Sequence, residues 1–575
     1  MKILLIQPPV QDFYQTSIRT QPIGLAYLAA SLKSHGLEVE ILDCQTGQKR
    51  SIPLPPELSY LRGFYPFNDR SPFKLYAGFH HFGMDWGEIG RRIEESKADV
   101  FGISCSFTPY YGEALTIARM IKKQDQRRIV VMGGAHVSCD PQGILRSPFV
   151  DYVVLGEGER RFPRLLTRIK RKGSEGLREM DGVGYRLNGE IQVNPLRRFI
   201  RDLDTLPYPA RELLDLDRYQ IEKRRSTMII TSRGCPHGCT YCSARLVMGT
   251  TFRSRAPEAI VEEMVECWKR FDIRAFDIED DNFTYDQGRA KRMMKMVIRT
   301  FGEGTLALTA MNGISFAALD GELLQLMKRA GFKTINLSFV TTNLFTKKRM
   351  KRPGGPMDFG QVLGEAEQAG LHVVAYAIFG ITGQTIPEMV DSLIYLMGRR
   401  VLIGPSIYYP TPGTPLFERC REEGILPLQP SQWRSSAFPV ETKEFSRIDL
   451  MTLFRLTRTI NFVKGKIDQG ELMEGMTWKR LNQILKEKVK IQAEAKLRDD
   501  NDVERDTLCP VPRARFNNGG PAWTDLLLML FEERAFFSLR KGPGGGYSVT
   551  KEASSKRVLD YFFEKGLEVP IQGSR

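Results

Sequence analysis

The strongest constraint on the fold is an alternation of short apolar runs with amphipathic helical patterns. Across residues 1–165 the apolar runs are KILLIQ, LEVEILD, DVFGISC, RRIVVMGG and DYVVLGEGE, and helical patterns such as GLAYLAASLKSHG lie between them. Continuous apolar strands that alternate with helices are typical of a parallel sheet with both faces covered. We therefore predict a doubly wound, Rossmann-like α/β domain over residues 1–165.

The alternation restarts near residue 225 and continues to about residue 425. Six further apolar runs occur here: STMIITS, AFDIED, TLALTA, KTINLSFV, HVVAYAIFG and VLIGPSIYY. Six strand–helix units predict a partial (β/α)6, TIM-like barrel over residues 225–425. Barrels of this kind carry their chemistry at the carboxyl ends of the strands.

The remaining segments have weaker patterns. Residues 48–85, rich in Pro, Phe and Tyr, are interpreted as a long insertion loop of the first domain. Residues 166–224 are predicted to be a linker with one hairpin, because Asn188-Gly189 favours a tight turn. Residues 426–575 are interpreted as a mostly helical C-terminal domain, with a helix over TDLLLMLFEERAFFSL before a glycine turn.

Composition narrows the class of protein. With 575 residues, 42% of them hydrophobic and 26% charged, the chain matches a globular protein of several domains. The start MKILLIQPPV has too short an apolar run for a secretion signal, and no stretch reaches the roughly 18 apolar residues that span a bilayer. We therefore expect a cytoplasmic protein. The net charge of +15 is spread along the chain and mixed with acids, which indicates a solvated basic surface and no specific nucleic acid partner.

Three of the nine cysteines, Cys235, Cys239 and Cys242, cluster in SRGCPHGCTYCSA, directly after the first predicted barrel strand. Cysteines in a long chain without a secretion signal indicate thiols and metal ligands rather than disulfides. A closed zinc site needs four ligands, but His237 lies inside the loop and no second pair follows. Three thiolates can instead hold a four-iron, four-sulfide cluster and leave one iron open for a small molecule. We therefore favour the cluster, with zinc as the minor alternative.

The spacing CxxxCxxC, with Tyr241 before the last cysteine, at the start of a six-unit barrel resembles the radical S-adenosylmethionine (SAM) superfamily. The resemblance implies that Cys235, Cys239 and Cys242 hold a 4Fe-4S cluster and that Tyr241 lies beside bound SAM. It also implies that the open iron binds the amino and carboxylate groups of SAM. One electron from the reduced cluster then cleaves SAM to a 5′-deoxyadenosyl radical.

Two later motifs extend the resemblance. EDDNFT resembles the second-strand motif that reaches the SAM amino group, which implies contacts from Asp280, Asp281 and Asn282; the run could equally cap a helix. AIFGITGQT resembles the fifth-strand adenine motif. Because Thr382 and Gln384 replace the usual Pro and Glu, only the strand backbone at Ile378, Phe379 and Gly380 is carried over.

The fourth predicted strand departs from the family pattern. It reads NLSFVTT, with Val340 where the family usually has a Glu that contacts the ribose. Valine cannot form that hydrogen bond, which leaves Ser338 as the candidate on this strand. This departure indicates an unusual subgroup.

The first domain resembles the cobalamin-binding domain that precedes many radical SAM barrels, through its QPIGLAYLAASLKSHGLEVEILD, GGAHVS and GEGE stretches. The resemblance implies cobalamin contacts at successive strand ends: Cys105, Ser106, Gly133, Gly134, Gly156 and Glu157. The alternative is that the glycines only form turns. No histidine lies in an Asp-x-His-x-x-Gly pattern, so the motif that usually supplies the lower cobalt ligand is absent.

These resemblances predict a cobalamin-dependent radical SAM enzyme that methylates an unactivated carbon of a small-molecule, lipid or peptide substrate. A low-potential electron donor such as flavodoxin or ferredoxin would be its partner. The alternatives are radical oxidative cyclisation or rearrangement, as in anaerobic magnesium-protoporphyrin ester cyclases, and less favoured tRNA methylthio transfer. A cobalamin- or metal-sensing module without enzymatic activity is the fourth possibility. The substrate and the oligomeric state are not predicted.

Overall fold

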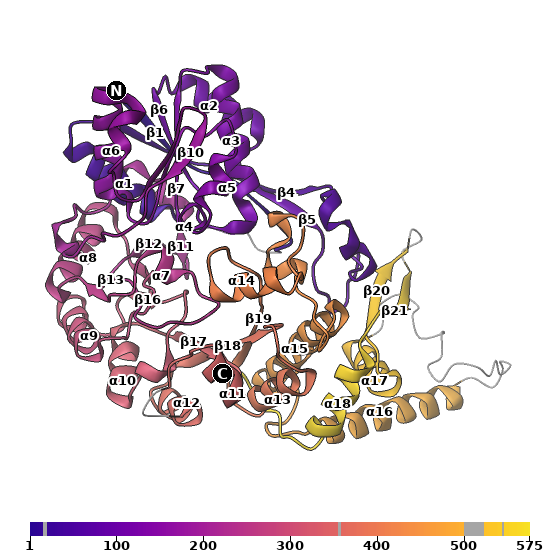
Figure 1. The fold of residues 1–575 in the computed structure, drawn as a ribbon. Helices are drawn as coiled ribbons and strands as arrows, with labels where there is room; N and C mark the ends of the chain where they lie inside the picture. The colour runs from indigo at the N-terminus through magenta and orange to yellow at the C-terminus, as the bar shows by residue number, and fades with distance from the viewer. Residues whose placement is uncertain (15–19, 355–357, 500–521, 543–545) are drawn as a thin grey trace.

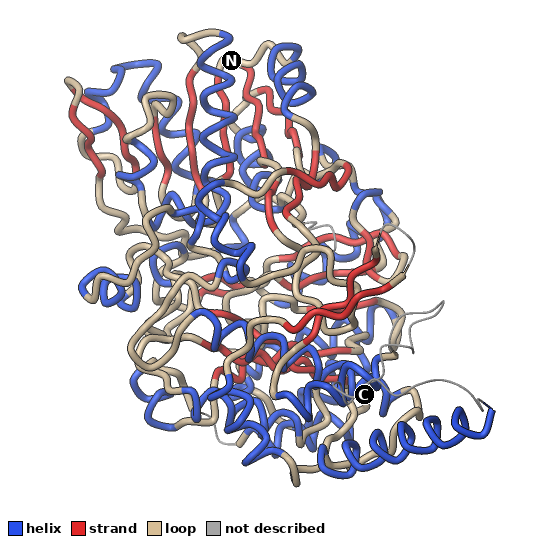
Figure 2. Tube along the Cα trace, turned by 90° about the vertical axis from the view of Figure 1, so that its right-hand side faces the viewer, coloured by secondary structure: helices blue, strands red, loops and turns tan. Residues whose placement is uncertain are grey.

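The computed structural model describes residues 1–14, 20–354, 358–499, 522–542 and 546–575. A sheet domain at the N-terminus stands above a barrel of strands and helices, and the C-terminal helices pack beside the barrel (Figure 1). Figure 2 shows that the strands form two separate layers, one for each predicted α/β unit. The predicted fold class, a doubly wound domain followed by a partial barrel and a mostly helical region, is confirmed.

The first sheet has seven strands in the order β10-β9-β8-β7-β6-β1-β3. Its five parallel strands are the five predicted apolar runs: β1 (Lys2–Gln7), β3 (Glu38–Asp43), β6 (Val100–Ser104), β7 (Ile129–Gly133) and β8 (Tyr152–Val154). After β1 the chain adds β3 on one side, then crosses to the other side of β1 and adds β6, β7 and β8 in turn. The strand order therefore reverses between β1 and β6. In open α/β sheets, ligands bind at such a switch point, outside the carboxyl ends of the strands.

Helices cover both faces of this sheet. Side chains alternate along β1, so Ile3 and Leu5 pack on one face while Leu4 and Ile6 pack on the other. The first face is covered by α1 (Ile23–Ser34) and α6 (Gly158–Lys172). The second face is covered by α2 (Trp86–Glu95), α3 (Tyr111–Gln124), α4 (Ala135–Cys139) and α5 (Pro141–Leu145).

The predicted hairpin is present but belongs to this sheet. Its strands β9 (Val183–Leu187) and β10 (Glu190–Val193) flank Asn188 and Gly189, which both have positive φ as a tight hairpin turn requires. Because β9 pairs antiparallel with β8, the hairpin forms the edge of the seven-stranded sheet. The linker interpretation of this segment identified the turn but not the strand that it pairs with.

The insertion is not a plain loop, because its two ends form strands of a small antiparallel sheet. It has the order β2-β5-β4, from β2 (Val10–Asp12), β4 (Gln48–Ile52) and β5 (Phe79–Gly83). The insertion reaches the far end of the chain: the Arg70 backbone N–H donates to the carbonyl of Leu539, 2.7 Å away. The Tyr65 hydroxyl likewise donates to the carbonyl of Ser436 at 2.6 Å. The indigo insertion therefore lies beside the yellow strands in Figure 1.

All six predicted barrel strands are confirmed as strands. They are β12 (Arg224–Ile229), β15 (Ala275–Ile278), β16 (Ala307–Thr309), β17 (Thr334–Val340), β18 (His372–Phe379) and β19 (Leu402–Ile407). Parallel bridges from Leu308 to Phe332 and from Ile314 to Leu337 join the two halves into one arc. The outer helices are α8 (Pro257–Phe271), α9 (Gln287–Phe301), α10 (Gly321–Ala330), α11 (Leu344–Arg349), α12 (Phe359–Gln368), α13 (Ile386–Met397) and α14 (Pro415–Glu422).

Short elements complete the barrel. Strand β11 (Gln220–Ile221) pairs with β12, and the two-residue strands β13 (Ser232–Arg233) and β14 (Arg253–Ser254) form an antiparallel ribbon. The one-turn helix α7 (Ala244–Val247) lies between the strands of this ribbon in the sequence.

The C-terminal region contains α15 (Arg447–Asp468), α16 (Trp478–Asp499), α17 (Trp523–Glu533) and α18 (Lys556–Gly566). The predicted helix through Leu539 was wrong beyond Glu533. Arg534 has a φ of 50°, which ends the helix, and β20 (Phe537–Lys541) then pairs with β21 (Tyr547–Lys551). No helix in the described ranges is both long and apolar enough to cross a membrane.

Candidate functional site

The three clustered cysteines lie in the loop between β13 and α7, at the carboxyl end of the first barrel strand. Cys239 is buried, and Cys235 and Cys242 are half-buried. Burial, together with the neighbouring Cys239 and Cys235, raises the pKa of the Cys242 thiol to about 11. Over the part of the chain that the structure describes, no three His, Cys, Asp or Glu side chains converge on a single-ion position. In a four-iron cluster each cysteine binds a different iron, so this set of three neighbouring thiols fits such a cluster.

Backbone geometry shapes the start of this loop. Gly234 has a φ of 83°, and a Cβ there would lie 2.3 Å from the carbonyl oxygen of Thr251. Only glycine can occupy such a position without displacing the backbone opposite.

Asp280 holds the strand that leads into the loop. Its Oδ1 accepts from the Thr231 backbone N–H at 2.7 Å, and its Oδ2 accepts from the Ser232 hydroxyl at 2.6 Å. Its neighbour Asp281 accepts from the Gly234 backbone N–H at 3.0 Å. Both Asp280 oxygens therefore position the loop, whereas the sequence motif implied a contact between this carboxylate and SAM.

Asn282 is the member of this motif that keeps an unused polar atom. Its Nδ2 donates to the Cys235 sulfur at 3.8 Å. Its Oδ1 is buried and has no hydrogen-bond partner among the described residues. An unsatisfied buried acceptor beside the cysteines fits the ammonium group of SAM.

The fourth barrel strand ends in a strained residue. Val340 is buried and has a φ of 73°, an unfavourable conformation for a β-branched side chain, and the pairing with β18 shifts between Ser338 and Val340. Arg352 donates to the Ser338 hydroxyl at 2.6 Å and to the Ser338 carbonyl at 3.1 Å. The same guanidinium lies against Tyr241 and Cys239, so Ser338 and Tyr241 are joined at the edge of the cysteine loop.

The predicted adenine-contact backbone has internal partners. Gln384 donates to the Ile378 carbonyl at 3.2 Å, and Tyr408 donates its backbone N–H to the Phe379 carbonyl at 2.9 Å. The Gly380 N–H points to the sulfur of Met389 at 3.3 Å. Contacts of this segment with SAM remain a prediction, and Gln384 stabilises the turn at the position of the usual Glu.

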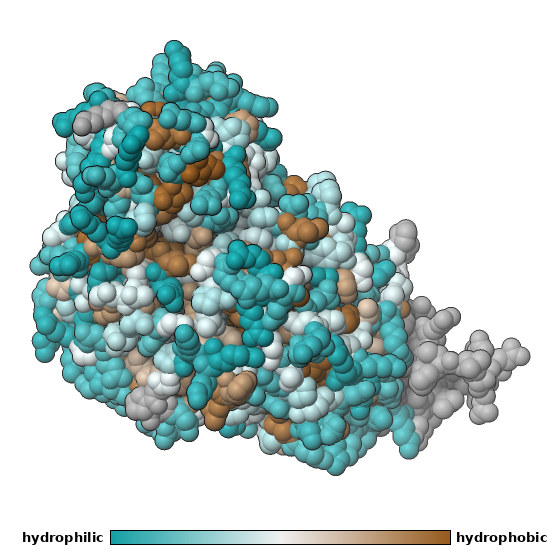
Figure 3. All heavy atoms as spheres, viewed as in Figure 1, coloured by the Kyte–Doolittle hydropathy of each residue, from teal (hydrophilic) through white to brown (hydrophobic). Residues whose placement is uncertain are grey.

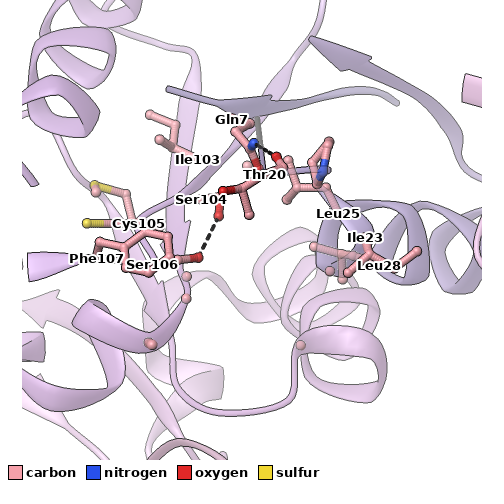
Figure 4. Close-up of a pocket in the computed structure, with 18 of the residues that line it drawn as sticks. Gln7, Thr20, Ile23, Leu25, Leu28, Ile103, Ser104, Cys105, Ser106 and Phe107 are labelled. Carbon is pink, nitrogen blue, oxygen red and sulfur yellow. Dashed lines mark hydrogen bonds between the residues drawn. The ribbon is translucent and has the colours of Figure 1, made fainter. Parts of the chain in front are cut away.

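A cavity of about 350 Å³ lies between the carboxyl edge of the first sheet and the barrel. All six residues predicted to contact cobalamin line it: Cys105, Ser106, Gly133, Gly134, Gly156 and Glu157. Figure 4 shows Ser104 to Phe107 on one side of this space and the start of α1 on the other. In Figure 3 hydrophobic residues are visible where the first domain meets the barrel.

The turn that follows β7 requires glycine. Gly134 has a φ of 112°, and a Cβ there would lie 2.7 Å from the carbonyl oxygen of Cys105. Glycine is thus required here by the close approach of the Cys105 backbone, and the contact of Gly134 with cobalamin stays a prediction.

Two glutamines that line the same cavity each have one buried amide atom without a hydrogen-bond partner among the described residues. Gln21 is buried; its Oε1 accepts from Thr227 Oγ1 at 2.7 Å and from the Met228 N–H at 2.9 Å, while its Nε2 has no partner among the described residues. The Oε1 of Gln45 is likewise buried and unpaired within the described ranges. Both residues line the cavity. One unused donor and one unused acceptor fit the carboxamide side chains on the corrin ring of cobalamin.

Sequence reasoning missed Gln21 and Gln45. A single glutamine in a loop has no recognisable motif, and the contacts of Gln21 with Thr227 and Met228 exist only after the two domains meet. The flanking Pro22, which precedes α1, was the nearest available signal.

Glu279 is a further carboxyl group on the cavity wall, at the end of β15. Burial, followed by the neighbouring Asp277, raises the pKa of Glu279 to about 8. Asn312 donates to Glu279 Oε2 at 2.5 Å, and Thr309 donates to Asp277 Oδ1 at 2.7 Å. A carboxyl group with a raised pKa therefore lines the space between the domains.

Two family models match the chain. The B12 binding domain matches residues 80–166, and the Radical SAM superfamily matches residues 229–396. The chain is a cobalamin-binding radical SAM enzyme. The cofactors of this radical SAM enzyme are accordingly cobalamin, a 4Fe-4S cluster and SAM, as the cysteine motif and the domain order predicted.

The enzyme is similar to several curated proteins along most of its length. An uncharacterized methyltransferase of Pyrococcus horikoshii is 26% identical over 82% of this chain and 95% of that protein. Cytidylyl-2-hydroxyethylphosphonate methyltransferase of Streptomyces wedmorensis is 26% identical over 75% of this chain and 84% of that protein. An anaerobic magnesium-protoporphyrin IX monomethyl ester cyclase of Synechocystis is 24% identical over 61% of this chain and 63% of its own.

The fold is also that of a solved radical SAM methyltransferase. TsrM from Kitasatospora setae, with cobalamin and a [4Fe-4S] cluster bound, superposes with a TM-score of 0.55. The match covers 76% of this chain and 81% of that chain at 18% sequence identity. At that identity the likeness establishes the fold and leaves the roles of individual residues to the geometry of this enzyme.

Proposed function

We propose that this enzyme transfers a methyl group to an unactivated carbon of a small-molecule or lipid substrate. The observation that carries the proposal is the shared wall between two cofactor sites. Arg233, Val247 and Met248 flank the cysteine loop, and the same three residues line the cavity that holds the predicted cobalamin contacts. When bound, the cluster would supply the electron that cleaves SAM, and cobalamin would supply the methyl group.

The chain's own residues prepare the space between these groups. Asp280 and Asp281 fix the loop that presents the thiols, and Asn282 offers an unpaired oxygen beside Cys235. Gln21 and Gln45 offer amide groups from the opposite side. A substrate held between the two sides would be shielded from water, which protects a radical intermediate from side reactions.

Substrate class and partners rest on the relatives and on the chemistry. The named relatives act on a phosphonate or a porphyrin ester, which are small molecules, and we extend that class to this enzyme. Because SAM cleavage consumes one electron, we infer a low-potential donor such as flavodoxin or ferredoxin as a partner.

The test is anaerobic reconstitution of the full chain with iron, sulfide and hydroxocobalamin, followed by reductant and SAM carrying a labelled methyl group. We expect 5′-deoxyadenosine, S-adenosylhomocysteine and label on the cobalamin. Absence of both SAM products would overturn the proposal. The Cys239→Ala variant should lose the cluster and SAM cleavage together, whereas Cys267→Ala, a buried cysteine on α8, should retain both.

Oxidative cyclisation is the second candidate, favoured by the match to the cyclase. Architecture does not separate the two reactions, but their products do. Cyclisation consumes SAM to 5′-deoxyadenosine without transferring its methyl group. In the same experiment it therefore predicts 5′-deoxyadenosine alone, with no S-adenosylhomocysteine and no labelled cobalamin.

A further inference from the structure

One carboxylate of the first domain is buried against the barrel. Glu157 follows β8, and its side chain is 0% exposed. Its Oε1 accepts from Arg233 Nη1 at 3.1 Å and from Arg253 Nη1 at 2.7 Å. Its Oε2 accepts from the Ile200 N–H at 2.7 Å. Both oxygens of this predicted cobalamin contact are therefore already bonded to protein groups, and its contact with cobalamin stays a prediction.

The two arginines stand at opposite ends of the cysteine loop. Arg233 is the last residue of β13 and immediately precedes Gly234 and Cys235. Arg253 Nη2 donates to the carbonyl of Met248 at 2.6 Å, just beyond α7. One carboxylate therefore holds the entry and the exit of the segment that carries all three cysteines.

Local pairing explains how a single carboxylate reaches both arginines. Arg233 and Arg253 are register partners in the β13–β14 ribbon, which brings their side chains to the same place. Glu159 also binds the Arg233 guanidinium, at 2.6 Å through Nη2. All of these charged side chains are less than 8% exposed, so each cation depends on a carboxylate of the first domain.

The same loop of the first domain also forms part of the cofactor cavity. Gly156 and Glu157 line the cavity, and Gly156 adopts a φ of 61°. A Cβ on Gly156 would lie 3.0 Å from the carbonyl oxygen of Val247, the last residue of α7. The loop thus has the cavity on one side and both flanks of the cysteine segment on the other.

We propose that Glu157 is a positioning residue that couples the cobalamin cavity to the cysteine loop. Through Arg233 and Arg253 it transmits occupancy of the cavity to the cluster, so that cobalamin binding shifts the reduction potential of the cluster. The inference rests on the proposed cofactor sites and adds a coupling between them. Thermodynamic reciprocity then requires that reduction of the cluster changes cobalamin affinity by the same factor.

The test compares the full-length enzyme with the Glu157→Gln variant, both reconstituted with the cluster. Glutamine keeps the size of the side chain but leaves both guanidinium groups without its charge. In the wild type, hydroxocobalamin should shift the midpoint potential of the cluster in titrations followed by electron paramagnetic resonance. In Glu157→Gln the shift should be lost, and iron release to a chelator should be about tenfold faster.

Asp449→Asn is the matched control. Asp449 is equally buried and also binds an arginine, Arg557, but it joins α15 to α18 in the C-terminal region. This variant should keep the wild-type shift. If Glu157→Gln does not fold, Arg233→Lys tests the same link, because lysine keeps the charge without bridging two carboxylates, and it should reduce the shift.

The outcomes separate the two proposals. If the wild type binds cluster and cobalamin and Glu157→Gln shows the same shift, the coupling is wrong and the proposed function stands. If hydroxocobalamin does not shift the midpoint potential of the cluster in the wild type, the coupling is wrong in the same way. If the wild type assembles no cluster or binds no cobalamin, the proposed function fails together with the inference.

Discussion

Asn282 donates its Nδ2 to the sulfur of Cys235 at 3.8 Å, while its own Oδ1 is buried without a partner among the described residues. We expect Asn282→Ala to assemble the cluster but to bind SAM about tenfold more weakly, because a hydrogen bond to a charged group is lost. The SAM-induced change in the resonance signal of the reduced cluster measures this affinity. Asn194→Ala, in the first domain, should leave it unchanged; equal SAM affinity in the Asn282 variant would contradict the assignment.

The backbone conformation of Val340 should make its substitution by glycine less destabilising than that of other buried valines. Its positive φ costs a β-branched residue about 1–3 kcal/mol, and glycine removes that strain. Val340→Gly should therefore destabilise the enzyme by about 1–2 kcal/mol less than Val373→Gly, which removes an equally buried valine from the neighbouring strand β18. Urea unfolding of both variants measures the difference. Equal losses would show that the conformation at Val340 is not strained.

At Gln21 a substitution can remove the side-chain NH₂ group while keeping the oxygen. Gln21→Glu keeps an oxygen for Thr227 and Met228 but removes the unpaired Nε2 donor from the cavity. We expect hydroxocobalamin to bind about tenfold more weakly, because a carboxamide oxygen of the cofactor would lose its donor. Titration followed by absorbance measures the affinity. Gln124→Glu on α3 changes the net charge equally outside the cavity and should bind normally.

Because of Glu279, we expect the stability of the folded enzyme to fall as pH rises. Its pKa is raised from 4.5 to about 8 in the folded enzyme, so above pH 4.5 the folded state holds a proton that the unfolded state releases. The contribution of this bound proton to the free energy of unfolding is complete below pH 4.5 and is lost progressively up to pH 8. Thermal midpoints measured from pH 5 to 8 should decline more steeply in the wild type than in Glu279→Gln. Parallel curves would refute the raised pKa.

The strands of both α/β units could be predicted because each buries both faces. KILLIQ and HVVAYAIFG read as continuous apolar runs, and parallel strands covered by helices need that composition. Strand β4 was missed for the opposite reason. Its residues QKRSI are mostly exposed, so no hydrophobic period marks them, and only pairing with β5 makes them a strand.

The residues of the site also divide into those that could be predicted from the sequence and those that could not. The cysteines were predictable because their spacing lies within one short loop and is set by the cluster itself. The role of Glu157 was not, since its arginine partners lie 76 and 96 residues away along the chain. The GEGE stretch marks a turn and a cavity wall, but it does not reveal which cations will be buried against it.

The small sheet that interrupts the first domain has a consequence for synthesis of the chain. In the segment between β4 and β5, Tyr65 bonds to Ser436, which lies 371 residues later, and Asp69 bonds to Leu539. At ordinary translation rates the partner of Tyr65 leaves the ribosome on the order of half a minute after it. Throughout that interval the aromatic cluster around Phe13 lacks its contact with Phe438. A nascent chain stopped after the barrel would therefore expose this aromatic surface on a domain that is otherwise folded, until the segment around Phe438 is synthesised.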